Sequence, residues 1–165
     1  MNVEHNLLCW NDVFQIGREI TTIQELILTG NSFYDEYFKD TEEKEEKVIL
    51  HHLTILVLND TETSWSFCNS ISDCFPMLQE LHLKSNRIPR IPVDRKSDYF
   101  HGSWQALHTV DISHNGCTWE TLVDCFGWLP SLRTLNADSN EIENITLHEN
   151  GTFDQLTTLS LSFNR

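Results

Sequence analysis

The chain has 165 residues, of which 39% are hydrophobic and 22% charged, a composition typical of one folded domain. Its formal net charge is −14, from 25 acidic and 11 basic residues. Such a charge disfavours nucleic-acid binding and favours a basic patch on a protein partner. No apolar run approaches the length of a membrane span, and the first thirty residues show no signal peptide, so we expect no membrane contact.

The cysteine pattern bears on the cellular compartment. The chain contains five cysteines, an odd number, and no C-x-x-C pair. This pattern argues against a zinc ribbon and against a complete disulfide framework. We expect reduced, buried thiols in a cytosolic protein, with no metal and no other cofactor.

One pattern recurs along the chain, and "LQELHLKSNRI" from Leu78 is a clear copy of it. The same spacing starts at residues 23, 53, 78, 107, 132 and 156, in steps of 30, 25, 29, 25 and 24 residues. We number the places of each unit from these starting residues. Places one, four and six are apolar in every unit, and place nine is Asn in all units except the second, where it is Thr61.

This spacing is the consensus of leucine-rich repeats, whose units run about 20–29 residues. It predicts an α/β solenoid of about six repeats, forming a single domain over 1–165 with a parallel sheet on its concave side. Strands are expected near 23–31, 53–61, 78–86, 107–115, 132–140 and 156–164. Places one, four and six are expected in the core, and the place-nine amide is expected to bond the turn and the neighbouring coil. A further apolar residue lies three before each start: Ile20, Leu50, Phe75, Trp104, Leu129 and Phe153.

Helices are expected between alternate strands, on the convex side. They are predicted to begin at Trp10, Trp65 and Trp119, each of which starts an apolar stripe at steps of three or four residues. Ser64 and Thr118 are the predicted N-caps of the second and third helices, whereas Cys9 caps the first poorly. Pro76 and Pro130 mark helix exits. We expect all three tryptophans to be core residues.

Two polar insertions lengthen the other units. Residues 33–47 contain seven acidic and three basic residues, and residues 89–103 contain two prolines and a basic cluster of Arg90, Arg95 and Lys96. The favoured interpretation of the acidic segment is a solvated loop, and a docking role is the less favoured one.

Several blocks resemble the leucine-rich repeat domain of the tubulin-folding cofactor E family, also called tubulin-specific chaperone E, and of its E-like paralogue. They are "LTILVLNDTETSWSFCNSISDCFPMLQELHLKSNRI", "LCWNDVFQIGREITTIQELILTGNSF" and, more loosely, "CTWETLVDCFGWLPSLRTLNADSNEIENI". The family's CAP-Gly signature and ubiquitin-like domain have no counterpart in the chain, which stops directly after a repeat strand. We therefore expect a fragment of a longer protein.

The resemblance implies a cytoplasmic, cytoskeleton-associated module that binds protein and is not an enzyme. It implies engagement of α-tubulin, together with other tubulin-folding cofactors, during assembly or dissociation of the tubulin dimer. No small-molecule substrate is implied.

The solvent-facing strand places predict where a protein partner would bind, because curved solenoids present such faces to partners. The candidate residues are Glu80, His82, Lys84, His108, Asp111, Arg133, Asn136 and Asp138. His82 is expected beside Asp111, and Lys84 two strands from Asp138. A metal site at His82, His108 and Asp111 lacks further ligands, and no nucleophile stands beside a base, so neither a metal site nor a catalytic site is favoured.

Two other functions stay open. One is an unrelated cytosolic leucine-rich repeat scaffold or adaptor. The other is an extracellular leucine-rich repeat recognition domain, which the N-x-T triplets at Asn59, Asn144 and Asn150 would suit. Chance is the favoured explanation of these triplets, since the chain is rich in Asn and Thr and lacks flanking cysteine caps.

Overall fold

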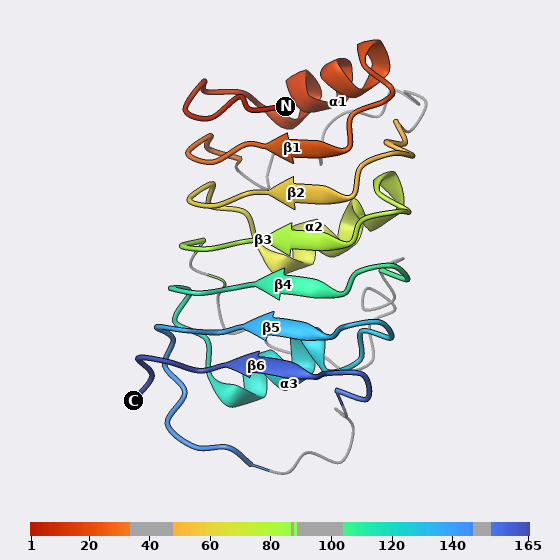
Figure 1. The fold of residues 1–165 in the computed structure, drawn as a ribbon. Helices are drawn as coiled ribbons and strands as arrows, with labels where there is room; N and C mark the ends of the chain where they lie inside the picture. The colour runs from red at the N-terminus through yellow and green to blue at the C-terminus, as the bar shows by residue number, and fades with distance from the viewer. Residues whose placement is uncertain (34–47, 87, 89–103, 147–152) are drawn as a thin grey trace.

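A single parallel sheet organises the protein. The computed structural model describes residues 1–33, 48–86, 88, 104–146 and 153–165. The strands are β1 Glu25–Ile27, β2 Ile55–Val57, β3 Glu80–His82, β4 Thr109–Asp111, β5 Thr134–Asn136 and β6 Thr158–Ser160. They form a six-stranded sheet in chain order (Figure 1). The architecture is therefore α/β and consistent with a solenoid, and each strand occupies places three to five of a sequence unit.

The register brings equivalent places of neighbouring units side by side. Place four of each strand pairs with place four of the next, as in Leu26 with Leu56 and Leu56 with Leu81. The place-four side chains of β1 to β5 are at most 1% exposed. Because side chains alternate between the faces of a strand, places three and five point to the opposite, solvent-facing side. The apolar spine thus fixes which side chains face solvent.

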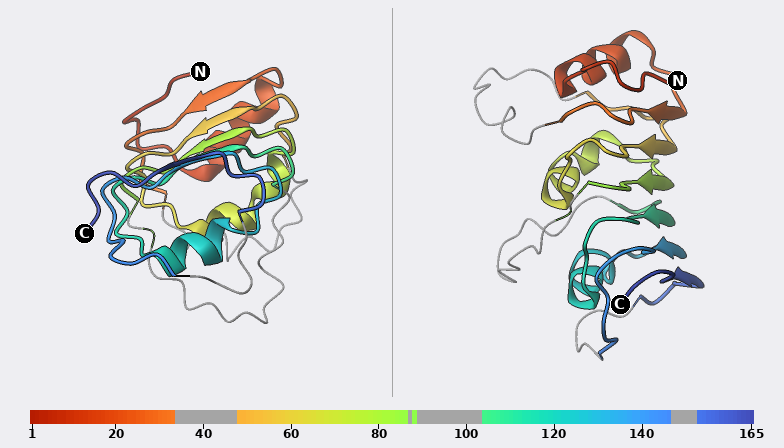
Figure 2. Two further views of the ribbon diagram at one scale, coloured as in Figure 1. Left: turned by 60° about the horizontal axis from the view of Figure 1, so that its bottom comes forward. Right: turned by 90° about the vertical axis from the view of Figure 1, so that its left-hand side faces the viewer.

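Helices cover the other side of the sheet (Figure 2). They are α1 Trp10–Glu19, α2 Trp65–Ser70 and α3 Trp119–Phe126, and a 3-10 turn, η2 Ser72–Cys74, follows α2. As predicted, the Ser64 hydroxyl accepts a hydrogen bond from the Phe67 N–H at 3.1 Å. The Thr118 hydroxyl accepts one from the Thr121 N–H at 3.4 Å. Each helix begins at the tryptophan that starts its apolar stripe.

The alternation of helices has a geometric cause. Neighbouring strands lie about 4.8 Å apart, whereas packed helices need about 8–10 Å between their axes. One helix for every two strands therefore fits without splaying the convex side, and the sheet curves only gently (Figure 2). Aromatic rings join successive helices directly: the Trp10 and Phe67 ring centroids lie 5.2 Å apart, and those of Trp65 and Phe126 lie 4.6 Å apart.

Place-nine side chains form a ladder along the end of the sheet where the strands finish. The Asn115 Oδ1 accepts from the N–H groups of Asn86 and Ile88, at 2.9 and 3.1 Å. Asn86 and Asn140 accept in the same way from the preceding unit. Where Thr61 replaces Asn, the Phe33 N–H binds the Thr61 backbone carbonyl instead, at 2.9 Å. The ladder therefore continues through the substitution by a backbone bond.

Residues 1–9 form a further partial coil, which the sequence analysis missed. Asn2 forms a parallel bridge with Ile27, and the Asn31 Oδ1 accepts from the N–H groups of Asn6 and Leu8, both at 3.0 Å. Asn6 is therefore at place nine of this coil, and Met1 is at place four. The left-handed residue at place eight recurs in every coil: His5, Gly30, Asp60, Ser85, His114, Ser139 and Phe163. This coil pairs with the free edge of β1.

Two core expectations were wrong in part. Ile20, for which no burial was predicted, caps the C-terminus of α1 and is 46% exposed. Leu159, at place four of β6, is 38% exposed, since β6 has a neighbouring strand on only one side among the described residues. Trp10 and Trp65 are buried, but Trp119 is only partly buried, and its Nε1 donates to the Thr146 carbonyl at 2.8 Å.

Candidate protein-binding surface

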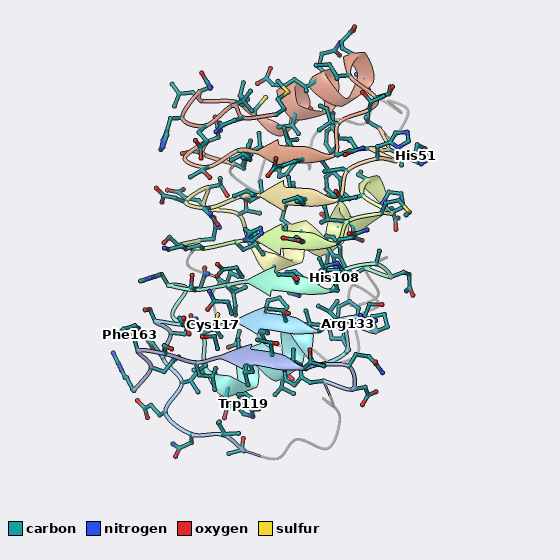
Figure 3. The ribbon with its side chains drawn as sticks, in the orientation of Figure 1. His51, His108, Cys117, Trp119, Arg133 and Phe163 are labelled. Atoms are coloured by element: carbon teal, nitrogen blue, oxygen red, sulfur yellow. The ribbon has the colours of Figure 1, made fainter. Side chains whose placement is uncertain are left out.

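The concave face consists of the side chains at places three and five of β1 to β6, with places two and seven at its borders. Helices α1 to α3 lie behind the sheet and leave this face open (Figure 2). Figure 3 shows His108 and Arg133 together at the end where β4 and β5 begin. The eight candidate residues therefore lie on one side of the molecule, on or beside β3 to β5.

His82 and Glu80 form the closest ionisable pair of this set. The His82 Nε2 lies 3.5 Å from the Glu80 Oε2, and the two side chains are 28% and 37% exposed. Asp111 is the register partner of His82 on β4, as the sequence predicted. His82 and Glu80 therefore present one imidazole and one carboxylate to solvent at the centre of the face.

Three candidate residues hold the backbone at the ends of strands. The Asp111 Oδ1 accepts from the Ser113 N–H at 2.9 Å, and the Asn136 Oδ1 accepts from the Asp138 N–H at 3.1 Å. The Asp138 Oδ1 accepts from the Ser162 N–H at 2.7 Å. Each bond satisfies the N–H at place seven of a unit. These side chains therefore have a structural role that the sequence analysis did not predict. The polar residues at places five and seven were the signal in the sequence that could have indicated this role.

The remaining candidates border the face. Lys84 and Arg133 are exposed, and the His108 Nδ1 lies 3.0 Å from the Thr109 hydroxyl. The Lys84 N–H binds the Asn59 Oδ1 at 2.9 Å, so the backbone is fixed while the ammonium reaches solvent. Lys84 and Arg133 therefore present positive charge at the two borders of the strands.

An apolar patch at the other end of the face was not among the predicted site residues. Ile27, Ile55 and Val57 are half-buried and lie on β1 and β2. Ile27 pairs in register with Val57, and Ile55 lies in register between Glu25 and Glu80. The signal in the sequence was that these three residues are apolar, whereas Thr or other polar residues occupy the same places, three and five, on β4 to β6.

Among the described residues no group of three His, Cys, Asp or Glu side chains is arranged to hold a metal ion. The five cysteines are free thiols, and burial raises the pKa of Cys117 to about 12 and also raises the pKa of Cys125. These two thiols therefore stay protonated and poorly nucleophilic near neutral pH.

A small polar pocket of about 260 Å³ lies beside the start of α3. Its lining includes Trp119, Glu141, Glu143 and Arg165. Arg165 lies 3.9 Å from both glutamates, so it offsets part of their negative charge. The pocket is separate from the concave face.

Several sequence features lie outside the described residues. They are the acidic segment apart from Phe33, the basic segment at 89–103 and the triplet at Asn150. Of the other two triplet asparagines, Asn59 is half-buried and Asn144 is exposed. Within the described ranges, no helix has both the length and the apolar content needed to cross a bilayer.

Comparison with known proteins shows a distant similarity. No protein-family model matches the chain. Over 143 residues, or 87% of its length, the chain is 24% identical to Tubulin-folding cofactor E from Arabidopsis thaliana. The chain spans 25%, or about a quarter, of the length of that protein. A match of this extent involves most of the units rather than one local motif.

Proposed function

We propose that the chain is a leucine-rich repeat module of a tubulin-folding cofactor. In this proposal six repeats and the partial coil of residues 1–9 present the concave face to α-tubulin, in assembly or dissociation of the tubulin dimer. The module acts in the cytoplasm with other tubulin-folding cofactors. It binds protein, has no enzymatic activity, and needs no nucleic acid, membrane or small-molecule substrate.

The similarity to Tubulin-folding cofactor E over 87% of the chain carries this proposal. The open concave face supports the binding role, because solenoids offer extended faces of stacked strands to their partners. A net charge of −14 also suits a partner that contributes basic groups.

Capture of α-tubulin from purified tubulin by the immobilised 165-residue chain tests the proposal. Lys84→Glu reverses an exposed charge beside β3 and should change capture about threefold to tenfold if the concave face is used. Arg18→Glu makes the same change of charge on α1, behind the sheet, and should leave capture close to that of the unchanged chain.

The outcomes separate the binding role from its location. Failure of the folded chain to retain tubulin at micromolar concentration would contradict a tubulin-binding module. Retention that both variants change equally would indicate a general charge effect. Retention that only Arg18→Glu reduces would place the contact on the helical side.

A further inference from the structure

The apolar patch on β1 and β2 is a specific feature of the concave face. At place three, β2 carries Ile55, whereas β4, β5 and β6 carry Thr109, Thr134 and Thr158. At place five, β1 and β2 carry Ile27 and Val57, whereas β4 to β6 carry Asp111, Asn136 and Ser160. Thr satisfies the strand preference for β-branched residues without exposing apolar surface. Strand propensity alone therefore does not explain Ile55.

Two carboxylates flank the patch along the same row. Glu25 precedes Ile55 in register and Glu80 follows it, one strand away on each side. Two strand spacings place these residues roughly 9.6 Å apart. Glu25 is exposed, and Glu80 keeps 37% of its side chain exposed beside His82. An apolar centre between two acidic groups is the arrangement of a small binding hot spot with a polar rim.

We infer that β1 to β3 bind an amphipathic helix that places a large apolar side chain on Ile27, Ile55 and Val57 and a basic residue on each of Glu25 and Glu80. Residues i and i+7 of a helix are separated by roughly 10.5 Å along its axis, which matches the separation of the two glutamates. Residues i+3 and i+4 lie between them on the same face. The gently curved sheet offers room for a helix laid across the strands (Figure 2).

This inference rests on the proposed function only in taking the helix to belong to the tubulin partner. It moves the centre of binding from β3–β5, where the sequence predicted it, to β1–β3. The chemistry of the patch is independent of the partner's identity, and the following experiment separates the two.

The probe is an 18-residue fluorescent helical peptide of Ala and Gln, with Lys at i and i+7 and Leu at i+3 and i+4. Its control has the same composition, with both Lys on the face opposite the Leu pair. Anisotropy titration of the 165-residue chain should show binding of the probe about tenfold or more tighter than binding of the control.

Variants copy residues that the same sheet already accepts elsewhere. Ile55→Thr gives β2 the place-three residue of β4 to β6, and Val57→Ser gives it the place-five residue of β6. The double variant should weaken probe binding about tenfold with little effect on the melting temperature. Glu25→Lys should weaken it about threefold to tenfold, and a probe with Glu in place of the facing Lys should regain affinity for this variant. Asp154→Lys, an exposed change away from the patch, is the control for net charge.

The peptide data decide the inference, and tubulin capture by the same variants decides the link to the proposed function. Equal binding of probe and control, or unchanged probe binding by the β2 variant, overturns the inference even if tubulin is captured. Probe binding that depends on Ile55 and Glu25 supports it even if tubulin is not captured. Loss of both activities in the β2 variant supports both proposals.

Discussion

At the scale of single residues, the buried place-nine asparagines each form several hydrogen bonds. Asn115 accepts two backbone N–H groups and donates to three carbonyls, those of Leu83, Ile112 and Ser113, at 2.8–3.1 Å. It is buried, so water cannot replace these bonds when the amide is removed. Each such residue thus ties two neighbouring units together.

We predict that Asn115→Ala lowers the free energy of unfolding by about 3 kcal/mol, since it strands several buried backbone groups. Urea denaturation followed by circular dichroism measures this loss. Asn11→Ala removes the same group from an exposed position of α1 and should change stability by less than about 0.5 kcal/mol. Similar values for the two variants would mean that water reaches the ladder.

The polar residues at places five and seven show why site prediction is difficult at this scale. Asp111, Asn136 and Asp138 have the residue types of a binding surface, yet each accepts a backbone hydrogen bond at a strand end. Their spacing in the sequence is the same for either role. Only the direction of each side chain in the structure shows that its oxygen accepts a hydrogen bond from a backbone N–H group.

At the scale of elements, helix capping follows residue type. Ser64 and Thr118 accept N–H groups at the starts of α2 and α3. At α1 the Cys9 N–H donates to the Asp12 Oδ2 at 2.9 Å, and this bond lowers the pKa of Asp12. A thiol is only a weak acceptor, so the reciprocal half of this capping box is weak.

Cys9→Ser should therefore raise the free energy of unfolding by about 0.5–1 kcal/mol, because a hydroxyl completes the capping box. The shift of the urea midpoint measures the gain. Ser64→Ala removes an established cap and should cost about 1 kcal/mol. A loss from Ser64→Ala without any gain from Cys9→Ser would show that the thiol already caps α1 adequately.

Also at the element scale, the partial coil of residues 1–9 carries fewer of the repeat's sequence signals than the other coils. The Val3 and His5 N–H groups donate to the carbonyls of Ile27 and Thr29 at 3.0 and 2.9 Å. Met1 falls at place four of this coil, so the place-one position on which the repeat was aligned lies outside residues 1–9. Asn6 and Trp10, at places nine and thirteen, were the remaining signals.

At the scale of the whole molecule, stability should differ between the two ends of the sheet. β1 has the partial coil on one side and β2 on the other, whereas among the described residues β6 pairs only with β5. Solenoid units are stabilised mainly by their immediate neighbours. The end at β6 should therefore open more readily.

Hydrogen exchange measured by mass spectrometry checks this difference. Amides of residues 156–164 should exchange about tenfold or more faster than those of residues 78–86, which have neighbouring strands on both sides. Residues 23–31 should resemble the central segment, because residues 1–9 cover their edge. Equal exchange in all three segments would mean that the sheet opens only as one unit.

Taken alone, the sequence determined the positions of the strands, the helices that begin at each tryptophan, and the two good N-caps. These features depend on periodicity and local hydrogen bonding, which are properties of neighbouring residues. The tertiary structure decided which side chains are exposed at the edges, such as Leu159 and Ile20, and that residues 1–9 form another coil. It also placed Ile55 between Glu25 and Glu80, because strand register brings together residues that lie 25–30 positions apart in the chain.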